Sequence, residues 1–393
     1  MTALAWDDSY RDELRALESK GLLRRFRVSS AAKMDGRTPL QFGSNNYLGL
    51  STHPRVVEAS INAARQYGAG STGSRLLSGN HALNAKLEQE LADFKQTEDA
   101  VVFSSGYTAN IGAVPRLFAD GDLILSDALN HASLIDGCRL SKAEKRVYPH
   151  LDAEAVDRIL RQERRNVRRA AIVTDGVFSV DGDLAPLPAL LKSAERRGAA
   201  VYLDDAHGFG VLGKRGRGTA EHFGLSKNRF LVKMGTLSKA LGSMGGYVCA
   251  SAAVCGVLRQ GARSFAFTHG LPPSALAAAL ESLRILRESP DLPARARSRA
   301  RRLRACLKGA GFRLTEAPAE TPVIAVLIGE AERAARLAER CFEKGLYAPA
   351  IRPPTVPPGS SRLRMSVMAT HTDAQIDEAA AILTEAAKEE RLI

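Results

Sequence analysis

Lys239 has the surroundings expected of a lysine that reacts through its amine. It ends the segment Gly235-Thr236-Leu237-Ser238-Lys239, which follows an apolar run. A lysine attacks a carbonyl only after its ammonium group has lost a proton, and burial favours that loss. The segment therefore indicates a Schiff-base lysine, with Thr236 and Ser238 able to hydrogen-bond a phosphate. Taken alone, it also fits a solvated loop lysine.

Asp204 follows a second apolar run, residues 199–203, and precedes Asp205, Ala206 and His207. A carboxylate at the carboxyl end of a parallel strand points into the crevice where such folds bind ligands. There it could pair with a protonated pyridine nitrogen, and His207 could contact the same ring. An N-cap aspartate beside a surface histidine is the alternative. A metal site is disfavoured because no further ligand cluster accompanies these residues.

Three further segments offer groups suited to a phosphate or a planar ring. Residues 104–110, which include Gly106 and Tyr107, form a Ser/Gly turn after an apolar run and could present backbone N–H groups to a phosphate. His131 could stack on a ring, and Ser179 could donate a hydrogen bond to a ring oxygen. Each pattern alone also fits a plain turn or a structural histidine.

A rigid segment carrying one arginine lies near the C-terminus: Ile351-Arg352-Pro353-Pro354-Thr355-Val356-Pro357. Because proline restricts the backbone, this chain must be stiff and extended. A guanidinium on such a segment is suited to a carboxylate, which it binds through two parallel hydrogen bonds. We expect Arg352 to bind the carboxylate of a substrate.

The composition limits the class of protein. Of 393 residues, 45% are hydrophobic and 25% charged, which excludes a disordered chain, collagen and a small disulfide scaffold. The net charge of +12 suits an acidic partner such as nucleic acid, a phosphorylated cofactor, a coenzyme A ester or an acidic carrier protein. Five cysteines without a C-x-x-C pair favour a reducing compartment. Since no apolar run approaches the ~18 residues of a membrane span, we expect a cytoplasmic protein.

The elements that must position these groups follow from the hydrophobic pattern. Short apolar runs alternate with helical stretches, which predicts a largely parallel sheet covered by helices on both faces. The predicted strands are residues 100–103, 123–125, 171–174, 199–203, 230–232 and 247–250. The predicted helices are residues 80–95, 152–164 and 186–197.

The pattern changes near residue 289, where we expect a smaller α+β domain to begin. Its predicted helices are residues 294–310 and 330–344 and one from Thr372, and its predicted strands are residues 323–328, 347–351 and 362–367. Thr372 and Gln375 have the spacing of a capping box. We therefore expect an N-terminal helix and arm (residues 1–42), a large domain (43–288) and a small domain (289–393).

Together these segments resemble the α-oxoamine synthase family of fold-type-I pyridoxal-phosphate enzymes, from about residue 42 to residue 371. The resemblance also includes Ser44-Asn45-Asn46-Tyr47-Leu48-Gly49-Leu50, residues 70–75 and residues 126–137. It implies an α/β fold whose large domain has a mostly parallel seven-stranded sheet, beside a smaller C-terminal α+β domain. It also implies a homodimer with composite active sites, in which residues 70–75 approach the partner's cofactor.

The resemblance further implies a role for each matching residue. Lys239 would hold pyridoxal 5'-phosphate and move the substrate proton, Asp204 would pair with the pyridine nitrogen, and His131 would stack on the ring. Ser179 and His207 would contact the ring oxygen side. The phosphate would be held by Gly106, Tyr107 and Thr236, and the substrates would be contacted by Arg24, Asn45, His131, Arg352 and Thr355.

The implied reaction is the decarboxylative condensation of an amino acid with an acyl thioester. The proline segment favours the biotin-pathway branch, which joins L-alanine to a pimeloyl thioester of coenzyme A or acyl carrier protein. A sibling reaction that uses serine, glycine or another acyl thioester stays open. Arg24 is the closest match to the arginine that reaches the distal acyl carboxylate in that branch, although a second register places Leu23 there.

A nucleic-acid-binding protein is the alternative of another class. Its basis is two runs of arginine: Arg161, Arg164, Arg165, Arg168 and Arg169, and Arg295, Arg297, Arg299, Arg301, Arg302 and Arg304. No interleaved aromatic residues accompany these runs, so a solvated helix face explains them better. We therefore expect neither nucleic acid nor a membrane as a partner.

Overall fold

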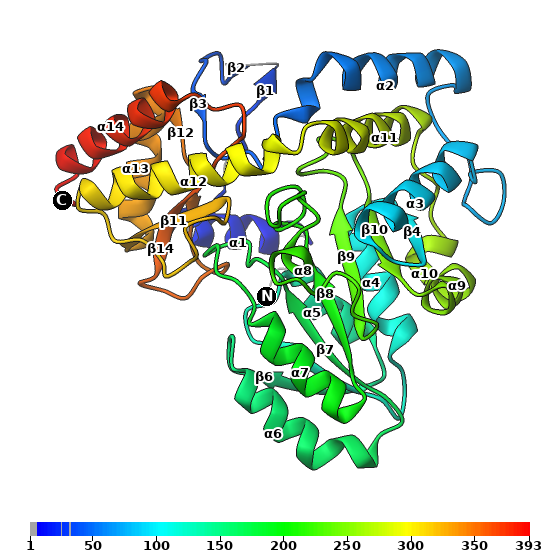
Figure 1. Ribbon diagram of the computed structural model, residues 1–393. Coiled ribbons are helices and arrows are strands. Elements are labelled where there is room, and N and C mark those ends of the chain that lie inside the picture. The colour runs from blue at the N-terminus through cyan, green and yellow to red at the C-terminus, as the bar shows by residue number, and fades with distance from the viewer. Residues whose placement is uncertain (1–5, 25, 31–32) are drawn as a thin grey trace.

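A seven-stranded sheet forms the centre of the protein, in a computed structural model that describes residues 6–24, 26–30 and 33–393 (Figure 1). The strand order is β4-β10-β9-β8-β7-β5-β6. Only β10 runs antiparallel to its neighbours β4 and β9, which confirms the mostly parallel sheet. The strands are β4 (Asp99–Phe103), β5 (Leu123–Asp127), β6 (Glu144–Tyr148), β7 (Ala170–Asp175), β8 (Ala200–Asp204), β9 (Leu231–Thr236) and β10 (Gly246–Ala250).

The six strands predicted from apolar runs are all present, and β6 is the strand that this pattern missed. Its sequence is Glu-Lys-Arg-Val-Tyr, and only Tyr148 is buried. As an edge strand it has one neighbour and needs no apolar face, so the hydrophobic pattern carries no signal for it. The predicted strand at 230–232 extends through the buried Lys233 to Thr236.

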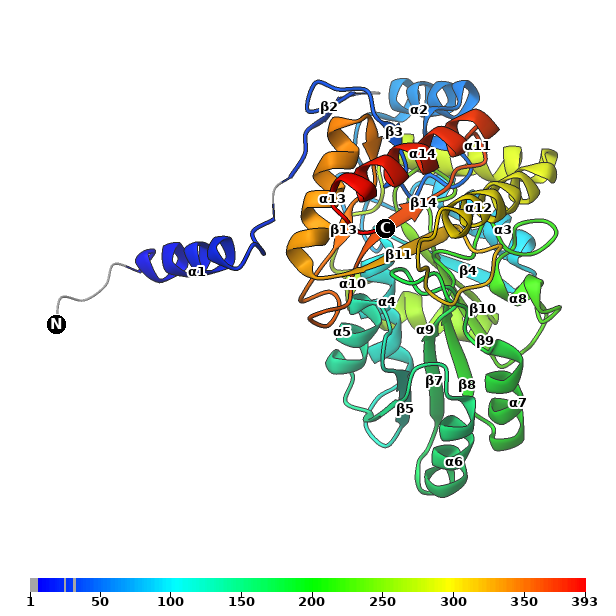
Figure 2. The same cartoon turned by 90° about the vertical axis from the view of Figure 1, so that its left-hand side faces the viewer.

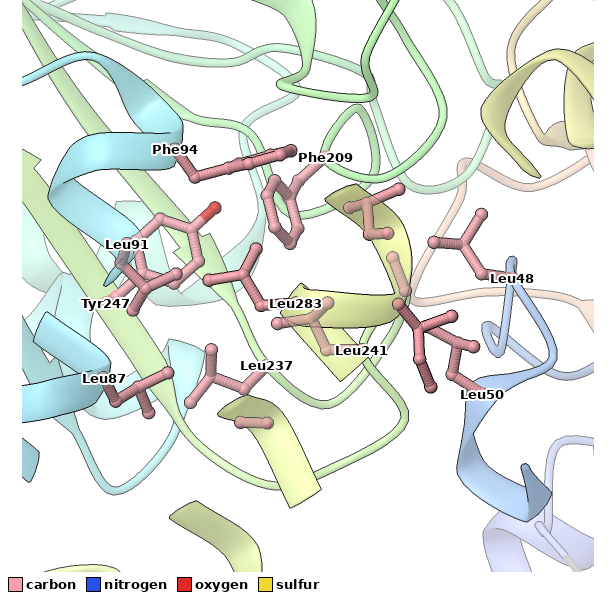
Figure 3. Packing of buried hydrophobic residues seen from close by; sticks show 14 of the residues in the cluster. Leu48, Leu50, Leu87, Leu91, Phe94, Phe209, Leu237, Leu241, Tyr247 and Leu283 are labelled. Atoms are coloured by element: carbon pink, nitrogen blue, oxygen red, sulfur yellow. The ribbon is translucent and has the colours of Figure 1, made fainter. Parts of the chain in front are cut away.

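Helices cover both faces of this sheet because alternate side chains of each strand point to opposite sides. In β5, Ile124 packs with α4 (Gly106–Leu117) and α5 (Ala132–Leu140), whereas Leu123 and Leu125 pack with α6 (Ala153–Glu163) and α7 (Leu187–Arg197). Figure 3 shows a third cluster, in which Leu87, Leu91 and Phe94 of α3 (Ala82–Lys95) meet Tyr247 of β10. The same cluster includes helices α2 (Pro54–Tyr67) and α11 (Pro273–Glu288). The carboxyl ends of the parallel strands are thereby left for ligand-contacting loops.

The C-terminal part has its own antiparallel sheet, β11 (Val323–Gly329), β14 (Ser361–Ser366) and β13 (Ala350–Ile351). Its helices are α12 (Asp291–Gly309), α13 (Ala331–Glu343) and α14 (Asp373–Glu389). The capping box of Thr372 and Gln375 is confirmed at the start of α14. The single strand predicted at 347–351 is wrong, because β12 (Leu346–Tyr347) pairs with β3 (Leu40–Gln41) while β13 pairs with β14. Pro349 lies between the two short strands and has no N–H to donate.

The N-terminal segment contacts the C-terminal part at several points, among them the pairing of β3 with β12 and the ion pair of Arg27 with Glu339. Figure 2 shows helix α1 (Asp8–Ser19) projecting away from the body, and none of its residues is buried. Phe42, by contrast, is fully buried in the core of the C-terminal part. The division at residues 42 and 288 remains a hypothesis, and this contact links the end of the arm to the small domain.

Candidate active site

The segments singled out in the sequence meet around a cavity of about 200 Å³ at the carboxyl ends of the parallel strands. It is lined by Ser105, Gly106, Tyr107, His131, Ser133, Asp175, Asp204, Ala206, His207, Met234, Thr236, Ser238 and Lys239. Eight residues from distant parts of the sequence are expected to contact the cofactor. Seven of them line this one cavity: Gly106, Tyr107, His131, Asp204, His207, Thr236 and Lys239. Ser179, the eighth cofactor contact expected, is absent from this lining.

Lys239 lies in the loop that follows β9, and its Nζ is 3.0 Å from Nε2 of His207. Burial lowers the pKa of Lys239 to about 8, and the positive charge of Arg364 adds to this effect while Asp204 opposes it. A substantial fraction of the amine is therefore neutral near physiological pH. That is the protonation state in which a lysine attacks a carbonyl or accepts a proton.

Asp204 is the last residue of β8 and is held in one orientation by two donors. Its Oδ2 accepts from Nδ2 of Asn110 at 2.7 Å, and its Oδ1 accepts from the backbone N–H of Ala206 at 3.0 Å. Asp175 is its register partner on β7, and burial together with the Asp204 charge raises the pKa of Asp175 well above its usual value. Two adjacent buried carboxyl groups suit a cationic ligand group, such as a protonated pyridine nitrogen.

The first turn of α4 forms one end of the cavity. The Ser105 side chain caps this helix by accepting from the backbone N–H of Thr108, and Gly106 and Tyr107 open it. Thr236 faces this turn, with its hydroxyl oxygen 2.7 Å from that of Ser238. Backbone N–H groups at a helix start, together with these hydroxyl groups, suit a phosphate.

A Cβ at Gly246 of β10 would lie 2.5 Å from the backbone oxygen of Ser105. A glycine there lets the strand approach the helix start closely, which positions the turn of Ser105 and Gly106 against the sheet.

Two histidines flank the cavity from different elements. His131 is the N-cap residue of α5, and burial lowers its pKa. His207 follows β8, and its Nδ1 lies 2.5 Å from the hydroxyl oxygen of Tyr47. Burial and the Lys239 charge lower the pKa of His207 well below its usual value. Both imidazoles are therefore neutral at physiological pH.

The expected substrate residues fall into two groups. Arg24, Arg352 and Thr355 line a larger cavity of about 930 Å³ between the N-terminal segment and the C-terminal part. Within it, Nη2 of Arg24 donates to the Thr355 hydroxyl at 3.3 Å, and Arg352 donates to the carbonyl of Gly21. Lys239 is not part of that lining. The structure therefore does not bring Arg352 to the reactive lysine.

Asn45, the remaining expected substrate residue, lies beside Arg364 of β14, a residue that the sequence interpretation missed. Nη2 of Arg364 donates to Oδ1 of Asn45 at 3.0 Å, and Nε donates to the carbonyl of Ser179 at 2.6 Å. Arg364 is buried, and its charge lowers the pKa values of both Lys239 and His207. The available signal was an arginine between two apolar residues, Leu363 and Met365, of a segment predicted as a strand.

The arginine runs make mostly internal contacts. Arg161 pairs with Asp157, Arg168 with Asp122, and Arg302 with Asp377. Arg297 donates to the carbonyls of Val211 and Gly213, and the buried Arg304 donates to that of Val323. Arg161, Arg168 and Arg302 thus neutralise acidic side chains, whereas Arg297 and Arg304 hold neighbouring backbone segments against α12.

The described part of the chain holds no cluster of three or more His, Cys, Asp or Glu side chains suited to a metal ion. Across the same residues, no helix combines the length and the hydropathy needed to cross a membrane. The five cysteines are all free thiols.

Comparison with known proteins gives a consistent result. The family model for aminotransferase class I and II matches residues 37–383. The chain is 46% identical to the 8-amino-7-oxononanoate synthase of Lysinibacillus sphaericus, over 94% of this chain and 96% of that protein. It is 47% identical to the enzyme of the same name from Geobacter sulfurreducens, over 96% and 97%.

Solved structures of two related enzymes share the fold. Serine palmitoyltransferase of Sphingomonas wittichii is 34% identical and superposes with a TM-score of 0.93, covering both chains completely. The 8-amino-7-oxononanoate synthase of Francisella tularensis is 31% identical, with a TM-score of 0.77 over 90% of this chain and 99% of that one. A variant of the serine palmitoyltransferase from S. paucimobilis, 34% identical to this chain, was solved with a bound aldimine of pyridoxal phosphate and myriocin.

Proposed function

Because the chain belongs to the aminotransferase class I and II family, and within it to the group of 8-amino-7-oxononanoate synthases, we propose that it condenses L-alanine with a pimeloyl thioester. The products are 8-amino-7-oxononanoate, carbon dioxide and the free thiol, and the reaction is a step of biotin biosynthesis. The observation that carries this proposal is the identity of 46–47% over nearly the whole chain. Identity to serine palmitoyltransferase, which has the higher TM-score, is 34%, and a shared fold alone does not fix the substrate.

The family's cofactor is pyridoxal phosphate, and the 200 Å³ cavity has a fitting set of groups. Gly106, Tyr107 and Thr236 would hold the phosphate, and Asp204 would pair with the ring nitrogen. His131 would lie on the ring face, with His207 and Ser179 toward the ring oxygen. When bound, the cofactor supplies an electron sink for negative charge on the substrate's α-carbon.

Lys239 then serves as the base that moves the substrate's α-proton. Its pKa of about 8 leaves enough neutral amine to accept a proton at Nζ and return it later. His207, 3.0 Å away, orients that amine. Because the pKa values of His131 and His207 are lowered, both imidazoles are neutral and place no second positive charge beside the Lys239 amine.

Arg364 is the arginine best placed for the carboxylate of alanine. It is buried beside Asn45, and its charge acts on Lys239 and His207. A guanidinium in a partly dry site binds a carboxylate through charge-assisted hydrogen bonds. We therefore propose Arg364, and not Arg352, for that role.

Arg24 and Arg352 suit the distal carboxylate of the pimeloyl chain. Neither guanidinium forms an ion pair within the described residues, whereas the neighbouring Arg27 pairs with Asp35 and Glu339. Two unpaired cations in a 930 Å³ cavity favour an anionic ligand group. A palmitoyl chain ends in a methyl group and would leave both guanidinium groups without an anionic partner.

The proposal is tested by product identification with mass spectrometry. Purified protein is incubated with alanine, serine or glycine, each with pimeloyl and palmitoyl thioesters. We expect 8-amino-7-oxononanoate from alanine and the pimeloyl thioester as the fastest reaction of the six. A faster reaction of serine with the palmitoyl thioester would reject the proposal and leave a sibling condensation in its place.

The proposed assembly is a homodimer with composite sites. Ser74 forms a bridge with His269, which brings residues 70–75 beside the 267–270 loop. Each segment has a large exposed apolar side chain in it or close to it in the sequence: Leu77 is 83% exposed and Phe267 is 77% exposed. Apolar side chains exposed to this degree favour burial by a second copy of the chain.

A cytoplasmic location is part of the same proposal. Free thiols persist in reducing compartments, and all five cysteines are free.

A further inference from the structure

Asn110 joins the two groups expected to contact the cofactor ring, although neither the sequence motifs nor the mechanism assigns it a role. It lies in α4, is fully buried, and contacts side chains of both β8 and α5. A buried amide with every hydrogen bond satisfied is rigid, so it can fix the orientation of its neighbours.

The orientation of the Asn110 side chain is determined by Tyr202. The Tyr202 hydroxyl donates to Oδ1 of Asn110 at 3.0 Å, so the amide nitrogen must face the other way. Its two N–H groups are donated to Oδ2 of Asp204 at 2.7 Å and to the hydroxyl oxygen of Ser133 at 2.9 Å. One residue therefore supplies a donor to the carboxylate and a donor to Ser133.

Ser133 transmits this arrangement to His131. Its hydroxyl accepts from Asn110 and therefore turns its own proton toward Nδ1 of His131, 2.7 Å away. The backbone N–H of Ser133 also donates to Nδ1, at 3.3 Å, in the N-cap of α5. The hydroxyl is the closer of these two donors, so the tautomer with an accepting Nδ1 and a protonated Nε2 depends mainly on the Ser133 hydroxyl that Asn110 orients.

We infer that Asn110 is a positioning residue that acts on both ring-contacting groups, holding the Asp204 carboxylate directly and fixing the tautomer of His131 through Ser133. The inference rests on the proposed function for the role of the two groups. The hydrogen-bond network consists of this chain's own residues, so it is measurable without substrate or turnover.

The direct test is NMR of cofactor-free protein labelled with ¹⁵N-histidine. The chain has eight histidines, so the His131 signals are assigned by their loss in His131→Gln. In the wild type we expect the Nδ1 signal of an unprotonated acceptor and the Nε2 signal of a protonated nitrogen. In Asn110→Leu, which removes both donors at similar volume, we expect signals of both tautomers. An unchanged single tautomer in Asn110→Leu would overturn the inference.

A matched pair of tyrosine variants separates this role from general core stability. Tyr202→Phe removes the donor that orients Asn110, whereas Tyr247→Phe removes a buried hydroxyl that has no hydrogen-bond partner among the described residues. We expect the second His131 tautomer in Tyr202→Phe and not in Tyr247→Phe. Identical His131 spectra in the two variants would refute the network, even if Asn110→Leu fails to fold.

The second readout is equilibrium binding of pyridoxal phosphate to cofactor-free protein. Loss of a donor to a carboxylate that pairs with the ring nitrogen should weaken binding by about tenfold or more in Asn110→Leu. Unchanged affinity would reject the Asp204 half of the inference. Neither readout depends on the acyl substrate, so a different condensation product would reject the proposed function and leave this inference standing.

Discussion

At the scale of the residue, Lys239 is distinguished by its position and not by its ionisation alone. Lys233, on the adjoining strand, is also buried, and burial lowers its pKa to about 8. Its Nζ, however, donates to the carbonyl of Lys95 at 2.8 Å and does not reach the 200 Å³ cavity. A lowered pKa becomes chemically useful only where the amine faces a ligand site.

These two lysines give a matched test of the reactive group. Lys239→Ala should reduce turnover by at least ~10²-fold, because it removes the base and the amine that binds the cofactor. It should also remove the absorption band of covalently held pyridoxal phosphate. Lys233→Met, which removes a buried ammonium outside the cavity, should keep that band. Comparable spectra and activity in Lys239→Ala and wild type would show that another group carries the chemistry.

We expect Arg364 and Arg352 to contact different substrates, so their alanine variants should raise the KM of different substrates. Arg364→Ala should raise KM for alanine by roughly ten- to a hundredfold, because a charge-assisted hydrogen bond is worth about 1.5–3 kcal/mol. KM for the pimeloyl thioester should change little in that variant. Arg352→Ala should show the reverse pattern. Steady-state kinetics with each substrate varied in turn provide the measurement, and a raised alanine KM in Arg352→Ala alone would restore the original expectation for that residue.

The difference between these arginines shows what the sequence can and cannot predict about the site. Lys239, Asp204 and His207 were predictable because each follows an apolar strand, and the carboxyl ends of parallel strands meet at one edge. Arg364 reaches Asn45 across 319 sequence positions, a contact that no local pattern encodes. For Arg352, the prolines predicted a rigid segment but not the cavity that it faces.

At the scale of the element, the loop that carries Ser179 is fastened by an ion-paired histidine. His150 follows β6 and contacts Asp127 at the end of β5 and Asp183 beyond Ser179. Burial alone would lower its pKa, but the hydrogen bonds that its imidazole donates to both carboxylates raise the pKa of His150 to about 9. Asp181, Arg313 and Glu316 line the adjoining cavity.

This pairing predicts a loss of stability at alkaline pH. Because the folded-state pKa of His150 is raised above its ordinary value of 6.5, its contribution is complete below pH 6.5 and is lost as the pH rises through about 9. His150→Gln should lack the stabilisation that these ion pairs provide. The difference in Tm between wild type and variant should therefore shrink between about pH 6 and about pH 10. A difference that stays constant or grows across that range would contradict the ion-pair role.

The elements themselves were largely predictable where burial is two-sided. All six strands with apolar runs and the helix starting after Thr372 occur where the pattern indicates. The pattern failed at β6, which is charged and lies at the sheet edge, and at residues 347–351, where Pro349 separates two short strands. Both cases are positions where pairing partners, and not the local sequence, decide the structure.

At the scale of the whole molecule, the exposed apolar side chains favour an assembly larger than one chain. Helix α1 projects from the body (Figure 2). Tyr10 and Leu14, four residues apart on this helix, are exposed on one helix face, and Trp6, just before the helix, is exposed as well. Leu77 and Phe267 are exposed on the body itself. A second copy of the chain is the occupant that the proposed composite sites require.

Composite sites predict complementation between two inactive variants. In Lys239→Ala the reactive lysine is absent. In Gly79→Ala the 70–75 segment is distorted, because a Cβ at Gly79 would lie 1.9 Å from the backbone oxygen of Gly73. Mixed dimers contain one site with an intact lysine and an intact partner segment, so mixing should restore part of the activity. Full activity of a monomer in sedimentation, or no recovery from mixed dimers whose formation is verified, would exclude composite sites.

The central claim is that this chain joins alanine to the pimeloyl group with loss of the alanine carboxylate. The most direct measurement follows alanine labelled with ¹³C at the carboxyl and methyl carbons, incubated with a pimeloyl thioester and the protein in deuterated water. We expect labelled carbon dioxide in equal amount to the released thiol. We also expect 8-amino-7-oxononanoate that keeps the labelled methyl carbon and carries deuterium at the carbon beside it. Thiol release without labelled carbon dioxide, or a product that retains the carboxyl label, would rule out this reaction.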